Sequence, residues 1–148
     1  MKKLLPPYLF LISIIVMALV CWSLGSPHLI GQPAIFFGGA LVLAGIGLAA
    51  KSSALFRKEQ TNIMTFGEPD KLVTTGAFKY TRNPMYLGFT VALVGFAILF
   101  GAAISSFAIV GLFILIADRW YIAFEENMMR SKFGEEYESY SKSVRRWI

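Results

Sequence analysis

Apolar residues along this chain gather into four long runs, separated by polar or glycine-rich connections. The runs cover roughly residues 5–24, 34–54, 84–103 and 105–124. Each is close to the length of about 20 residues that a helix needs to cross the hydrocarbon core of a bilayer. The pattern therefore predicts an all-α integral membrane protein with four transmembrane helices, in a single domain over residues 1–148.

The first run resembles a secretory signal peptide because it follows Lys2 and Lys3. It is long for such a segment, however, and bulky Trp22 and Leu24 stand where a signal peptide has a small-residue cleavage site. We therefore expect it to be retained as a membrane anchor.

Charge distribution predicts the orientation. The chain has 14 Lys and Arg residues, and none lies in the connections 25–33 and 101–106. With four spans, all of them fall on or near the side of the N-terminus, so the positive-inside rule places both termini in the cytoplasm. The net charge of +5 is then explained by the orientation of the chain in the membrane, and no nucleic-acid partner is expected. Lys2-Lys3 and the small size suit a bacterial inner membrane.

Composition narrows the function classes. Hydrophobic residues make up 56% and charged residues 16% of the chain, whereas an ordinary soluble domain has roughly 25% charged residues. A soluble enzyme is therefore excluded. Because Cys21 and His28 are the only residues of their kinds, neither an internal disulfide nor a metal site built on several such ligands is expected.

The segment before the third run holds the first candidate chemistry. Glycine, proline and short polar residues over 61–76 predict a structured loop. Asn83 is placed as a helix N-cap and Pro84 as the first helical residue. A helix start favours a bound carboxylate or phosphate, and Arg82 and Tyr86 would flank it. The alternative is that these two side chains only anchor the span at the interface.

The end of the fourth run carries charge at membrane depth, where charged side chains face protein or a watery cavity. Helical spacing predicts that Arg119, Glu126 and Arg130 form a ladder on one face, with Asp118 and Glu125 on the adjoining face. One interpretation is a salt-bridge network that closes the helix. The other is that a carboxylate receives the cation of a ligand.

The tail is predicted to form a separate short helix. Gly134 should end the preceding helix, and an aromatic and apolar face follows at spacings of three and four residues: Tyr137, Tyr140, Val144 and Trp147. We expect an interfacial helix on the membrane surface. A role in covering a site is also open. Together, a helix start, carboxylates and aromatic rings suit a zwitterionic cationic ligand such as S-adenosylmethionine, among others.

The residues Leu72 to Gly88, the pair Glu125-Glu126 and the stretch from Phe133 to Tyr140 resemble the isoprenylcysteine carboxyl methyltransferase family, which is related to the phospholipid methyltransferases. The resemblance covers roughly residues 60–148. It implies that S-adenosylmethionine binds near the cytoplasmic surface without a Rossmann domain, and that a lipophilic acceptor enters from the bilayer.

The family motif Arg-His-Pro-x-Tyr-x-Gly aligns with residues 82–88. By this resemblance the expected cofactor-binding residues are Tyr80, Arg82, Asn83, Pro84, Tyr86, Leu87, Gly88 and Glu126. The expected catalytic residues are Glu125, Glu126 and Arg130. Asn83 stands where many members have histidine, and because Asn does not titrate near neutrality it is not a catalytic base.

The implied reaction is in-line methyl transfer. A carboxylate or thiolate acceptor is already nucleophilic and needs positioning and desolvation rather than a base. An amine acceptor must lose a proton, for which Glu125 and Glu126 are the candidates. Two alternatives stay open: an NADPH-dependent membrane reductase like the sterol reductases, and a small four-span transporter that uses Asp118.

Overall fold

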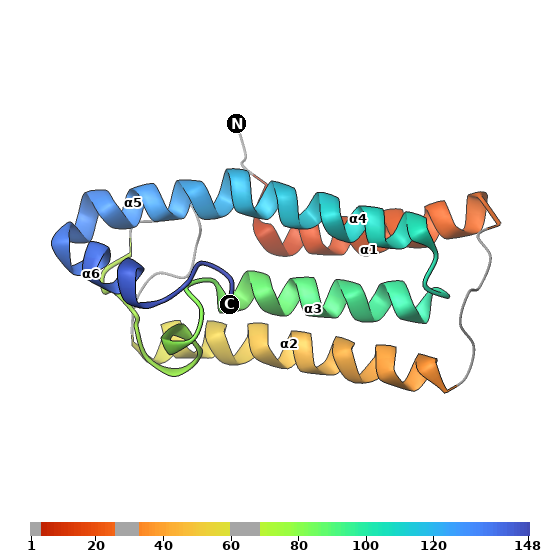
Figure 1. Ribbon diagram of the computed structural model, residues 1–148, viewed down its shortest axis with the longest axis horizontal. Helices are drawn as coiled ribbons and strands as arrows, with labels where there is room; N and C mark the ends of the chain where they lie inside the picture. Colours follow the sequence, from red (N-terminus) through yellow and green to blue (C-terminus); the bar gives the residue numbers. More distant parts are fainter. Residues whose placement is uncertain (1–3, 26–32, 60–68) are drawn as a thin grey trace.

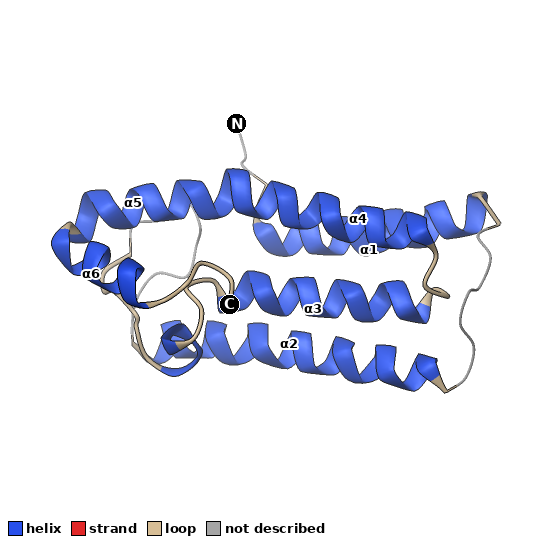
Figure 2. Ribbon diagram, viewed as in Figure 1, coloured by secondary structure: helices blue, strands red, loops and turns tan. Residues whose placement is uncertain are grey.

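The computed structural model describes residues 4–25, 33–59 and 69–148, and these residues form helices and connecting loops without strands (Figure 2). His28 and the first half of the polar loop predicted over 61–76 lie outside the described residues. The elements are α1 (Pro6–Ser23), α2 (Ala34–Lys58), a 3-10 turn η1 (Gly76–Lys79), α3 (Pro84–Leu99), α4 (Ile104–Ile116), a π-helical segment η2 (Ala117–Ile122), α5 (Ala123–Phe133) and α6 (Glu135–Ser143).

Three helices are long and apolar enough to cross a membrane: Pro6–Ser23, Ile35–Lys58 and the continuous stretch Ile104–Phe133. The predicted third span, 84–103, is too long, because α3 has only 16 residues. Gly101 and Ala102 both have positive φ, and the Ala102 N–H donates to the Ala97 carbonyl at 2.8 Å, which closes the helix four residues early. Within residues 4–25, 33–59 and 69–148, the structure therefore shows three long apolar helices and one shorter apolar helix.

α3 is the central helix of the bundle, between α2 on one side and α1 with α4 on the other (Figure 1). Glycines allow α2 and α3 to approach closely. A Cβ atom on Gly45 would lie 2.4 Å from the Gly88 carbonyl oxygen, and a Cβ atom on Gly95 would lie 2.6 Å from the Gly38 carbonyl oxygen. Such small-residue contacts hold membrane helices together by close backbone packing. This packing fixes the start of α3 relative to α2.

The opposite side of the bundle has a conventional apolar core. Met17 of α1, Leu93 of α3 and Phe113 of α4 are fully buried or nearly so. Many outward-facing side chains on α1, α2 and α4 are large and apolar, as expected for lipid contact.

The long α4–η2–α5 helix extends past the start of α3, and α6 then folds back toward the bundle (Figure 1). Gly134 has φ +52° and separates α5 from α6, as predicted. The predicted surface role of α6 is wrong in one respect. Tyr137 is 3% exposed, and the Tyr140 hydroxyl donates to the Phe78 carbonyl at 2.7 Å. The aromatic face of α6 therefore packs on the protein, because α6 folds back against the rest of the chain.

Candidate active site

A cavity of about 340 Å³ lies at the end of the bundle where α3 begins. This size is typical of small-molecule sites. Its apolar lining residues come from the start of α1 and from α2, α3 and α5, and include Leu5, Pro6, Phe56, Phe89 and Met129. Its polar lining residues come from the segment that precedes and opens α3, from α5 and from α6: Arg82, Asn83, Tyr86, Glu125, Glu126, Tyr137 and Tyr140.

Tyr86 and Glu125 form one polar contact on this cavity. The Tyr86 hydroxyl donates to Glu125 Oε1 at 2.8 Å, and the Tyr86 side chain is 6% exposed and stacks near Tyr121 with ring centroids 6.4 Å apart. Because α3 begins at Pro84, its first turn and the positive end of its dipole border the cavity. A negative and a positive site therefore lie within one small space.

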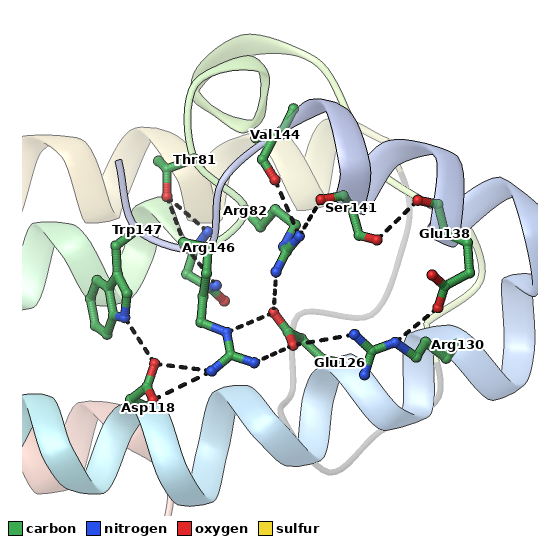
Figure 3. Close-up of polar contacts among 11 residues, drawn as sticks. Thr81, Arg82, Asp118, Glu126, Arg130, Glu138, Ser141, Val144, Arg146 and Trp147 are labelled. Carbon is green, nitrogen blue, oxygen red and sulfur yellow. Dashed lines mark hydrogen bonds and ion pairs between the residues drawn. The ribbon is translucent and has the colours of Figure 1, made fainter.

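Glu126 is the centre of a guanidinium cluster (Figure 3). Its Oε1 accepts from Arg82 Nη2 at 2.8 Å and from Arg146 Nε at 3.1 Å, and its Oε2 accepts from Arg146 Nη2 at 2.6 Å. Arg130 Nη2 lies 3.8 Å from Oε2. The residue is 3% exposed. A salt-bridge network is therefore present at this carboxylate, with Arg82 and Arg146 rather than Arg130 in the short contacts.

The predicted ladder is only partly formed. Arg130 pairs with Glu126, but Arg119 lies 3.7 Å from Asp118 and points outward, with 81% of its side chain exposed. The π-helical segment η2 explains why Arg119 points away from Glu126. A π-helical insertion adds one residue to a turn of an α-helix, and it therefore rotates the side chains before it by about 100° relative to α5. Arg119 leaves the face of Glu126, and Asp118 moves onto it.

The segment Val144–Trp147, here called the C-terminal strap, crosses from α6 to the start of α3. The Arg82 N–H donates to the Arg145 carbonyl at 2.9 Å. Thr81 Oγ1 and Asn83 Nδ2 donate to the Arg146 carbonyl at 3.2 and 3.0 Å. Asn83 stands at the N-cap position as predicted, but its side chain makes no capping hydrogen bond to α3 and donates to the strap instead.

The ionisable side chains around the cavity keep the protonation states that their hydrogen bonds require. The hydrogen bonds from Arg146 to Glu126 raise the pKa of that guanidinium. Burial raises the pKa of Tyr137, and it raises the pKa of Tyr140 to about 12. Both phenols therefore stay neutral at physiological pH, and Tyr140 keeps the proton that it donates to Phe78.

The structure gathers six of the ten predicted site residues on the cavity: Arg82, Asn83, Pro84, Tyr86, Glu125 and Glu126. The described residues that line the cavity do not include four others: Tyr80, Leu87, Gly88 and Arg130. Tyr80 is 80% exposed. Gly88 faces α2 because the helix pair needs a residue without a side chain there. Arg130 instead joins Glu126 to Glu138, with Nε donating at 3.0 Å.

Sequence reasoning missed Arg146. Its Nη1 donates to Asp118 Oδ1 at 3.3 Å, so that it bridges Asp118 and Glu126. A charge at the depth of Asp118 requires a partner, so the sequence did indicate that some basic residue would pair with it. It did not indicate which of the 14 basic residues would supply it.

Comparison with known proteins decides the family. Residues 33–136 match the model of the phospholipid methyltransferase family, which is well over half of the chain. The chain belongs to this family. The predicted resemblance to membrane methyltransferases is therefore confirmed.

Three relatives of this phospholipid methyltransferase family protein illustrate the match. An uncharacterized protein of Haemophilus influenzae is 36% identical over 64 residues, 43% of this chain and 100% of the relative. A protein-S-isoprenylcysteine O-methyltransferase of Schizosaccharomyces pombe is 37% identical over 76 residues, 49% of this chain and 30% of the relative.

The third relative is a probable protein-S-isoprenylcysteine O-methyltransferase of Oryza sativa subsp. indica. It is 33% identical over 82 residues, 53% of this chain and 41% of the relative. The match thus spans less than half the length of these two named methyltransferases. No solved structure matches the chain significantly.

Proposed function

We propose that this protein is an S-adenosylmethionine-dependent membrane methyltransferase that methylates a lipophilic acceptor. Membership of the phospholipid methyltransferase family supports the reaction class. The observation that carries the proposal is the mixed lining of the cavity, in which Tyr86, Glu125 and the start of α3 stand among apolar side chains. The polar groups suit a charged donor, and the apolar side chains suit an apolar acceptor.

The residues present fit the donor. Glu125 suits an ammonium group, because its carboxylate lines the cavity and is oriented there by the Tyr86 hydroxyl. The positive end of α3 suits a carboxylate, and the buried rings of Phe78, Tyr137 and Tyr140 offer flat surfaces to an adenine. When bound, S-adenosylmethionine supplies a methyl group on a cationic sulfur.

The chain itself would contribute orientation and exclusion of water. Tyr137 and Tyr140 line the cavity, and their rings exclude water there, which lowers the local dielectric and strengthens polar contacts. A carboxylate or thiolate acceptor then needs no base. For an amine acceptor we assign the base role to Glu125, because a carboxylate that is paired with several guanidinium groups is a poor proton acceptor.

The two alternative functions draw no support from the side chains of the site. A reductase would need cations for the phosphates of NADPH, but Arg82 and Arg146 are engaged with Glu126. A transporter would need Asp118 for its cargo, but Asp118 accepts from Arg146 and Trp147.

A binding experiment tests the proposal directly. Calorimetry on detergent-purified protein should show micromolar binding of S-adenosylmethionine and of its demethylated product. Glu125→Gln should weaken this binding by about tenfold, the ratio for one charge-assisted contact. Tyr86→Phe should weaken it less, because the phenol only orients Glu125. The matched variant Tyr80→Phe should leave it unchanged, since that ring is 80% exposed. Wild-type protein that is folded and fails to bind either compound would contradict the proposal.

We also propose that α3 crosses the membrane despite its length, so that both termini and the cavity are cytoplasmic. Its 16 residues span about 24 Å at 1.5 Å per residue, and local thinning of the bilayer accommodates such a mismatch. Fusions at residue 148 should be fluorescent with a cytoplasm-dependent reporter and inactive with a phosphatase that requires export. An active phosphatase at this position would overturn the four-span topology.

A further inference from the structure

Asp118 lies outside the cavity and yet is tied to the residues that build it. It is not among the described residues that line the cavity. Its Oδ1 accepts from Trp147 Nε1 at 2.9 Å, and Arg146 Nη1 lies 3.3 and 3.4 Å from its two carboxylate oxygens (Figure 3). The carboxylate therefore binds the side chains of two consecutive residues of the C-terminal strap.

The π-helical segment allows Asp118 and Glu126 to contact the same arginine. Asp118 and Glu126 are eight positions apart, which on a regular α-helix separates their directions by about 80°. The extra residue in η2 (Ala117–Ile122) brings the two directions to within about 20° of each other. Both carboxylates can then bind one guanidinium, that of Arg146. π-helical insertions often occur at functional sites, and this one has a definite geometric effect.

The strap is thus fixed on two sides. On the helix side, Asp118 and Glu126 hold Arg146, and Asp118 holds Trp147. On the loop side, Thr81, Arg82 and Asn83 hold the strap backbone. Arg82 also donates through Nη1 to the carbonyl oxygens of Ser141 and Val144, at 2.6 and 3.2 Å. Any change in the strap is therefore transmitted to Arg82, Asn83 and Glu126, which line the cavity.

We propose that Asp118 and Trp147 are positioning residues for the methyl donor, which act through Arg146 to hold the strap against Arg82, Asn83 and Glu126 at the cavity. This inference rests on the function proposed above. Neither residue touches the cavity, so their effect must pass through the strap. With Asp118 intact, Arg146 keeps Glu126 and Arg82 in place, and the donor leaves slowly.

Two substitutions separate the contacts that Asp118 makes. Asp118→Asn keeps an oxygen that can accept from Trp147 but removes the charge that pairs with Arg146. Trp147→Phe keeps an aromatic ring but removes the N–H donor. The matched control is Trp120→Phe, because Trp120 is 70% exposed and lies outside this network.

The experiment measures affinity and strap protection with the demethylated product of S-adenosylmethionine as the probe. Asp118→Asn should raise the Kd about tenfold, mainly through faster dissociation, and Trp147→Phe about threefold. Trp120→Phe should match the wild type. Hydrogen exchange should show that the probe slows exchange of the amides of residues 144–148 in the wild type, and that Asp118→Asn removes this effect while exchange in α2 and α3 is unchanged.

The outcomes separate this inference from the function on which it rests. Wild-type protein that binds the probe, together with Asp118→Asn protein that binds equally well and retains the protection of the strap, would overturn the positioning role and leave the proposed function intact. Faster exchange throughout the bundle of the variant, to the same degree in α2, α3 and the strap, would also contradict it, because a merely structural residue acts on global stability. Failure of the wild type to bind would overturn the proposed function and this inference with it.

Discussion

Replacement of Glu126 by glutamine is expected to destabilise the fold by about 3–5 kcal/mol and to reduce methyl-donor binding below detection. Removal of one partner from a buried ion pair costs this much because the remaining charge loses its compensation. Here the carboxylate, with 4% of its side chain exposed, separates the guanidinium groups of Arg82 and Arg146. Glutamine has nearly the same shape, so the effect reports the charge rather than a cavity.

The consequences for the site follow from the positions of the arginines. Arg146 retains Asp118 as a partner after the substitution, but Arg82, whose side chain is 12% exposed, keeps only carbonyl acceptors. Arg82 directly precedes Asn83 and α3, so its displacement moves the polar lining residues of the cavity. Loss of stability and loss of binding are therefore expected together.

Glu138→Gln is the matched control for this prediction. Glu138 also pairs with an arginine, since Arg130 Nε lies 3.0 Å away, but its side chain is 47% exposed. Exposed pairs contribute about 0–1 kcal/mol. Thermal unfolding in detergent and calorimetry should show a large effect for Glu126→Gln and almost none for Glu138→Gln. Equal effects of the two substitutions would mean that Glu126 is not the centre of the network.

The features of this fold that could be predicted from the sequence are those that local pattern determines. Apolar run length gave the helices, Asn83-Pro84 gave the start of α3, and Gly134 gave the break before α6. Arg82, Asn83, Pro84, Tyr86 and the two glutamates, which line the cavity, were assigned to one site from the family resemblance, together with four residues that do not line it. These features depend on neighbours in the chain or on a shared motif, and so a single sequence contains them.

The features that escaped prediction depend on partners distant in the sequence. Nothing near Asp118 shows that Arg146 completes its coordination. The π-helical segment has no sequence signal of its own, and it reverses which of Asp118 and Arg119 faces Glu126. Gly88 belongs to the expected motif, yet its packing role appears only when α2 is placed beside it. In each case the contact depends on a residue or on an irregularity of the backbone that the neighbouring sequence does not indicate.

The contact between α2 and α3 predicts a second large effect, at a position with no polar chemistry. Gly45→Val should destabilise the protein by about 3 kcal/mol, at the upper end of the range for overpacking. Even the first added carbon would lie 2.4 Å from the Gly88 carbonyl oxygen and 2.5 Å from the Ala92 nitrogen. Both atoms belong to a helix backbone, so neither can rotate away, and the helices must separate.

Gly47→Val is the matched control, because it lies on the same helix with nothing within 4 Å of the position of an added Cβ. It should change stability by less than about 1 kcal/mol, since only helix propensity is affected. Separation of the helices would also move the start of α3, and with it Tyr86 and Arg82, away from α2 and Phe56. We therefore expect Gly45→Val, but not Gly47→Val, to lower both the unfolding temperature and donor affinity. If Gly45→Val bound the donor normally, the α2–α3 contact would not be what positions the site.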